Sequence, residues 1–184
     1  MPTLIHEFSW PDRVVVGTIG LPGARTFYLQ VRTGKQIVSI ALEKQQSALL
    51  AENIDEILDQ LMTVEGNRFS VPTSTPIELV DNDQLETVQE QFRAGAMGLG
   101  WDPTTAQIVI EVHPIVDIDV DDNDESLDED DSNETEMLVV RIPVGTARAF
   151  AKRTREIVGA GRPTCPRCGF PMDADGHVCT LPEV

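Results

Sequence analysis

The same succession of hydrophobic patterns occurs twice along the chain, and this repetition limits the folds open to it. Three short strand-like runs come first, the second of them rich in β-branched or aromatic residues, and a stretch with apolar residues at helical spacing follows. The strand-like runs are residues 17–21, 27–31 and 36–40 in the first copy and 95–99, 108–112 and 136–140 in the second. The sequence therefore predicts an α+β fold of two internally duplicated β-β-β-α units, packed as a pseudo-dimer about a twofold axis.

A repeated glycine motif anchors the alignment of the two copies. Gly17 and Gly20 of G-T-I-G-L correspond to Gly95 and Gly98 of G-A-M-G-L at an offset of 78 residues, which grows to 81 at the second strand and 100 at the helix. Both predicted helices carry an apolar stripe, formed by Leu50, Ile54, Ile57, Leu58 and Leu61 in the first and by Ala147, Phe150, Ala151, Ile157 and Val158 in the second.

The offsets also give the domain organisation. We expect a first unit at 1–66, a connection at 67–91 with a short helix at 84–92, a second unit at 92–160 and a tail at 161–184. The last jump in offset marks residues 117–136 as an insertion, which holds twelve of the 31 acidic residues and no Lys or Arg. Such a self-repelling segment is expected to be a disordered loop.

The tail carries a metal-binding pattern, Cys165-x2-Cys168-x8-His177-x-Cys179. Three thiolates and one imidazole are a common tetrahedral set for structural Zn²⁺, and four protein ligands leave no open position for catalysis. Gly169 is expected to relieve the backbone after the second cysteine. A disulfide with one free thiol and a catalytic zinc are the alternatives, and the odd number of cysteines argues against the disulfide.

Two further groups of residues are candidate binding sites. Arg148, Lys152 and Arg155 follow one another at helical spacing and could contact a protein partner or nucleic-acid phosphates. A solvated helix face, or one paired with the protein's own acidic loop, is the alternative. The four glycines of the repeated motif could bind a ligand between the two units, whereas a bend in each strand is their structural interpretation.

Other features exclude classes of function. No apolar run approaches the ~18 to 20 residues of a membrane-spanning helix, and the N-terminus lacks the pattern of a signal peptide. We therefore expect a cytoplasmic protein without membrane contact. Apart from His177 the only histidines are His6 and His113, and no catalytic motif surrounds them.

Several segments resemble a known family. They are P-D-R at 11–13, V-G-T-I-G at 16–20, R-T-F-Y-L-Q at 25–30, A-L-E-K-Q-Q at 41–46, F-R-A-G at 92–95, R-A-F at 148–150 and the tail C-P-x-C-G-x-P-x-D with G-H-x-C. The chain is similar in these to actinobacterial proteins described as a domain of unknown function. The resemblance implies a cytoplasmic protein with a C-terminal zinc site, and no particular activity.

These observations favour a non-enzymatic scaffold or adaptor that binds structural zinc and docks a protein partner. A nucleic-acid-associated protein that uses the basic helix and the zinc tail is the second hypothesis. An enzyme or small-ligand binder with its site between the units is the third.

Deletion of residues 119–135 should leave the thermal unfolding midpoint nearly unchanged, because a self-repelling acidic loop buries little surface. Calorimetry of the deletion variant beside the full chain tests this. A large fall in the midpoint would show that the segment packs as structure.

Overall fold

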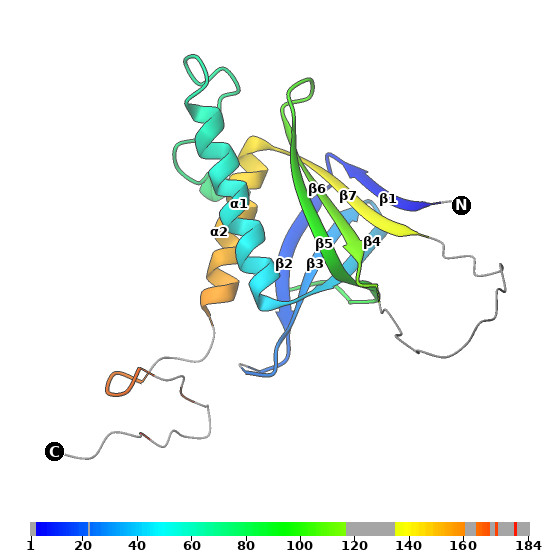
Figure 1. Cartoon of the computed structure of the whole chain (residues 1–184), viewed down its shortest axis with the longest axis vertical. Coiled ribbons are helices and arrows are strands. Elements are labelled where there is room, and N and C mark those ends of the chain that lie inside the picture. The colour runs from blue at the N-terminus through cyan, green and yellow to red at the C-terminus, as the bar shows by residue number, and fades with distance from the viewer. Residues whose placement is uncertain are drawn as a thin grey trace, which may run out of the picture.

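The computed structural model describes residues 3–21, 23–116, 135–160, 165–169, 172 and 179. In chain order the elements are β1 (Leu4–Ser9), β2 (Arg13–Ile19), β3 (Thr26–Thr33), β4 (Gln36–Leu42), α1 (Lys44–Met62), the short 3₁₀ helix η1 (Ile77–Leu79), β5 (Glu90–Asp102), β6 (Gln107–Pro114), β7 (Glu136–Pro143) and α2 (Val144–Gly159). The α+β class is confirmed, with one seven-stranded sheet and two helices (Figure 1).

The strands follow the order β1-β7-β6-β5-β4-β3-β2 across the sheet. Within each predicted unit the strands form an antiparallel meander, β2-β3-β4 and β5-β6-β7, and a helix comes next. A parallel pairing of β4 with β5 joins the meanders, and β1 pairs in parallel with β7 at the far edge. All six predicted strands and both helices are therefore present in the predicted order.

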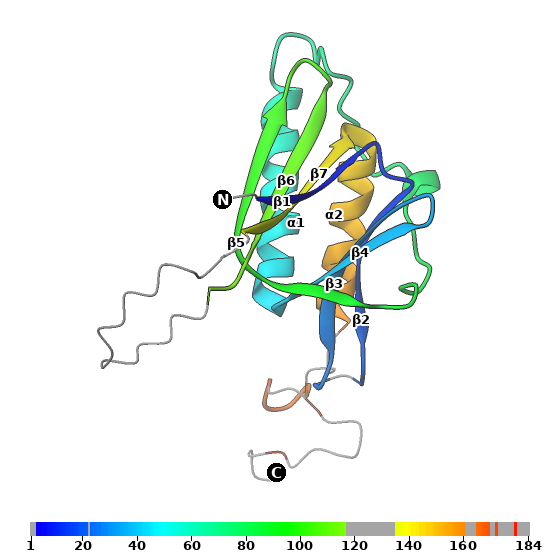
Figure 2. The ribbon, with the colours of Figure 1, turned by 90° about the vertical axis from the view of Figure 1, so that its right-hand side faces the viewer.

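The sheet is strongly curled. β1 and β2 occupy opposite edges, yet only Trp10, Pro11 and Asp12 connect them. A link of this length spans roughly 14 Å when extended, so the two edges must approach each other. Figure 2 shows the curled sheet in front of the two helices, which both lie on one side of it.

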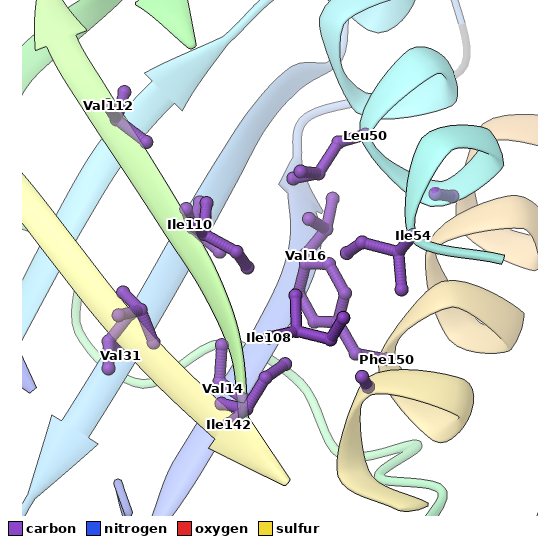
Figure 3. Close-up of a cluster of buried hydrophobic side chains, with 14 of the residues drawn as sticks. Val14, Val16, Val31, Leu50, Ile54, Ile108, Ile110, Val112, Ile142 and Phe150 are labelled. Atoms are coloured by element: carbon purple, nitrogen blue, oxygen red, sulfur yellow. The ribbon is translucent and has the colours of Figure 1, made fainter. Parts of the chain in front are cut away.

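One hydrophobic core lies between the helices and the concave face of the sheet. Leu50 and Ile54 of α1 and Phe150 of α2 pack into a buried cluster with side chains from both meanders (Figure 3). Alternate strand residues such as Val16 and Ile110 face this core and are completely buried. The helices lie side by side and antiparallel, and α2 packs against β2 of the first meander. The second helix thus packs across both predicted units, mainly on β2 of the first and also on β6 and β7 of the second.

The opposite face of β2, β3 and β4 is covered by residues 81–86, which we call the strap. The buried side-chain amide of Gln30 donates to the Glu86 carbonyl at 3.2 Å and accepts the Glu86 N–H at 2.9 Å. Leu85 packs so closely on Gly17 that a Cβ there would lie 2.5 Å from its Cγ. Strand-like bonding of this kind prevents the helix predicted at 84–92, and the chain enters β5 at Glu90 instead.

Two arginines secure the strap at Asp81. Arg13 binds both carboxylate oxygens of Asp81, at 2.6 and 3.1 Å. Arg153 of α2 is buried and donates to the carbonyls of Asp83, at 2.6 Å, and of Val16, at 3.1 Å. The hydrogen bond from Arg13 lowers the pKa of Asp81 below its ordinary value.

The strand registers allow the predicted duplication to be examined. Leu29 pairs with Ile40, and Ile110 pairs with Val140, so the offsets of 81 and 100 are compatible with the pairing. The first strands of the two units do not fit, however. Leu29 pairs with Val16 and Ile110 pairs with Leu99, so the register gives an offset of 83 residues between these strands rather than 78. The alignment of Gly17 with Gly95 is therefore wrong, whereas superposition of the two units stays a prediction.

Other sequence predictions meet the structure only in part. The strand β1 is not among the predicted strands, and Pro143 is the N-cap of α2. Most of the predicted insertion, residues 117–134, lies outside the described residues, as does most of the tail. In the part of the chain that the structure describes, no helix is long and apolar enough to cross a membrane.

Replacement Asp81→Asn should lower the free energy of unfolding at pH 7, because the charged partner of Arg13 is lost. A carboxyl with a lowered pKa contributes stability above its ordinary pKa of about 4 and loses it as the pH falls through the folded value. Urea unfolding of the variant and the unsubstituted chain should thus differ at pH 7 and converge towards about pH 3. Asp83→Asn is the control, since Asp83 receives its arginine bonds through its carbonyl. An equal difference at both pH values would contradict this role.

Candidate metal centre

The chain bends sharply between Cys165 and Gly169, after the end of α2. The Gly169 N–H donates to the Cys165 carbonyl at 2.9 Å, and Gly169 has a φ of +75°. Residues other than glycine rarely adopt this backbone conformation. The expectation that Gly169 relieves the backbone after the second cysteine is therefore confirmed. This loop directs the side chains of Cys165 and Cys168 to the same side, as in the knuckles of structural metal sites.

Three thiols meet at this loop. The sulfur atoms of Cys165, Cys168 and Cys179 all lie within 4.8 Å of one another. Thiolates at about 2.3 Å from a tetrahedral Zn²⁺ are about 3.8 Å apart, so small rotations would complete such a set. The Cys165 side chain is buried, and backbone N–H groups of Cys168 and Arg167 lower the pKa of its thiol to about 6. The cluster can therefore bind a metal ion as thiolates.

The fourth predicted ligand, His177, lies outside the described residues. The chain itself places His177 two residues before Cys179, whose sulfur belongs to the cluster. Its imidazole as a ligand thus stays a prediction, whereas the grouping of the three cysteines is part of the structure.

The structure places the predicted basic stripe against the acidic face of α1. Arg148 is buried and bonds Asp55 and Asp59, each at 2.8 Å. Arg155 pairs with the same Asp55, and Lys152 pairs with Glu156 of its own helix. Arg148 and Arg155 are therefore engaged by carboxylates of α1 and Lys152 by its own helix, and Arg148 is a link between the helices.

The four glycines proposed as ligand-binding do not come together. Gly17 lines a cavity of about 400 Å³ beside the strap, and Gly20 occupies the turn after β2 with a φ of +103°. Gly95 lies three strands away from them in the sheet and lines a separate groove of about 620 Å³ between α1 and β5. Gly98 is in β5 opposite Glu111.

A groove between α1 and β5 contains Gly95, one of the four glycines predicted to bind a ligand, but the sequence does not predict the groove itself. Its other lining residues are Gln46, Leu49, Leu50, Asn53, Glu56, Ile57, Gln60, Met97 and Leu99. We refer to it below as the α1–β5 groove. Among these residues only Gly95 is predicted from the sequence to bind a ligand, because the helical pattern assigns Leu50 and Ile57 to the core and the other α1 residues to solvent. The three glycines at 95, 98 and 100 are the signal that could have indicated an accessible strand backbone here.

Comparisons with known proteins identify one family. A family model described as "Protein of unknown function (DUF3090)" matches residues 6–179, which include all three clustered cysteines and His177. Neither the curated proteins nor the solved structures contain a match to this chain.

Replacement Arg148→Met should reduce the free energy of unfolding by about 3 kcal/mol, because it leaves the largely buried Asp55 without one of its cationic partners. Lys152→Met on the same helix is the control and should change stability by less than about 0.5 kcal/mol, since its pair with Glu156 is exposed. Urea denaturation measures both. Equal effects would mean that the Arg148 pairs do not link the helices.

Proposed function

The chain belongs to the DUF3090 family, and we propose that it is a zinc-binding interaction protein whose tail is folded around one structural Zn²⁺. The observation that carries this proposal is the convergence of Cys165, Cys168 and Cys179 on one point after a tight loop. His177 would complete a Cys₃His set. The metal would then serve as a cross-link, since four protein ligands leave no position for a reacting water.

The chemistry of the donor set favours zinc over other cations. Calcium and magnesium prefer oxygen ligands, whereas three thiolates select a softer metal. The lowered pKa of Cys165 supports thiolate formation near neutral pH. A segment as short as the tail buries little apolar surface, so metal binding would supply much of its folding free energy.

An interaction role is favoured over nucleic-acid binding because of the ion pairs on α2. Arg148 is 7% exposed and held between two carboxylates, so it is not available to phosphates. Phosphate binding by Arg155 would require it to leave Asp55. The α1–β5 groove, by contrast, offers a partner an accessible surface.

Protein purified without chelators should contain about one zinc per chain by elemental analysis, and Cys168→Ser should lose it. Circular dichroism of this variant should retain the signal of the sheet and helices, because Cys165 is the only buried tail residue among those that the structure describes. Arg167→Ser, which changes the same loop but no ligand, should keep the metal. Far less than one equivalent of zinc in the unsubstituted chain would refute the proposal.

A further inference from the structure

The edge of β5 that faces α1 has no strand partner along most of its length. Within the described residues, β4 pairs with β5 only as far as Arg93 and then ends, at Leu42. β5 continues to Asp102, paired with β6 on its other side. An unpaired strand edge presents a row of backbone donors and acceptors.

The hydrogen bonds show which residues of β5 turn their backbone to that edge. The Ile115 N–H donates to the Arg93 carbonyl at 2.9 Å, so Arg93 faces β6 and Ala94 faces away. The Ala94 carbonyl accepts the side-chain amide of Gln46 at 3.1 Å instead.

β5 has a bulge between Ala94 and Met97, where its register with β6 shifts. The direction of the backbone groups alternates regularly along β6, so it also gives the orientation of β5 beyond the bulge. Pro114 pairs with Ala94, and Val112, two residues earlier on β6, pairs with Met97. Met97 and Leu99 therefore also direct their N–H and C=O groups away from β6, into the α1–β5 groove.

The corresponding position on β2 shows what such an edge binds. Val16 is paired with Leu29 as Leu99 is paired with Ile110. The Val16 carbonyl accepts a hydrogen bond from the buried guanidinium of Arg153, and the strap covers the neighbouring surface. On α1, the residue one hundred positions before Arg153 is Asn53, which is exposed and too short for this contact. Among the described residues, no cation therefore occupies the edge of β5 as Arg153 occupies the edge of β2.

The walls of the groove suit an extended chain. Leu49, Ile57, Met97 and Leu99 provide apolar surface, and Leu49 is 54% exposed although it is a large hydrophobic residue. The volume of about 620 Å³ lies within the range of specific binding sites.

Among the residues that the structure describes, the only charged one that lines the groove is acidic. Glu56 is exposed, and no ion pair involving it is found among the described residues. A cationic side chain of a partner would neutralise it, whereas an acidic segment would be repelled.

We propose that the α1–β5 groove binds an extended peptide segment of a partner protein, which adds to the free edge of β5 and places a Lys or Arg beside Glu56. Backbone hydrogen bonds to Met97 and Leu99 would supply affinity, and the apolar walls would select alternate side chains. The inference rests on the proposed interaction role and names its partner, but it does not depend on the metal.

The test pans a displayed library of random peptides of about ten residues on the full chain. The unsubstituted protein should enrich peptides with alternating apolar residues and a Lys or Arg. Asn53→Trp, which fills the groove from an exposed position, should enrich none. An equal thermal midpoint for the two proteins verifies that the variant is folded. Absence of enrichment over Asn53→Trp would overturn the proposal.

Two N-methylated forms of a selected peptide examine the backbone contacts. Methyl groups on one set of alternate amides should weaken binding at least about tenfold, and methyl groups on the other set should not, because only one set faces β5. Equal behaviour of both forms would show that the groove takes side chains or small molecules, and would overturn strand addition.

Two substitutions complete the design. Glu56→Lys should weaken the binding of a selected Lys-containing peptide about two- to five-fold. The variant should instead prefer the same peptide with Glu in place of that Lys. An unchanged preference would refute the assigned role of Glu56. Cys168→Ser should bind the peptides like the unsubstituted chain, so failure of the zinc proposal and failure of the groove proposal give different results.

Discussion

The parallel pairing of β4 with β5 is the contact on which the architecture depends. Three residue pairs, at Ser39, Ile40 and Ala41 of β4, join two antiparallel meanders into one sheet. Immediately afterwards β4 ends and the chain turns into α1, while β5 continues. The Glu43–Arg93 ion pair and the bonds from the Gln46 amide to the carbonyls of Ala94 and Gly95 tie the start of α1 to β5 at this point. One short junction thus creates the common core and leaves the edge of β5 beside a helix.

The protein treats its two comparable strand edges differently. At β2 the buried Arg153 and the strap satisfy the carbonyl of Val16 and cover the outer face. At β5 the edge borders an open groove with Glu56 on its wall. Unpaired edges invite association with other chains, and proteins usually cover them. The open edge is therefore the place where we propose that a partner adds to the fold, whereas the three clustered cysteines all come from this chain.

Local patterns were sufficient to predict most of the secondary structure. The six strands and two helices follow from β-branched runs and helical spacing, and the three cysteines from their motif. The short strand β1 cannot be predicted from local patterns, because Phe8 is its only buried residue and its sequence shows little alternation. Residues 84–92 have a helical composition, but the amide of Gln30 and the edge of β4 hold them extended. The partners of Arg148 could not be predicted, because Asp55 and Asp59 come from a helix about ninety residues away.

The exposure of the backbone amides at the edge of β5 can be measured directly. Hydrogen exchange of single backbone amides, followed by NMR on the full chain without a peptide, separates the groups that face the groove from those that face β6. The amides of Met97 and Leu99 should exchange at least about tenfold faster than those of Gly98 and Gly100, whose backbones point to β6. Equal protection of all four amides would mean that another part of the molecule already pairs with this edge, and would contradict the open groove.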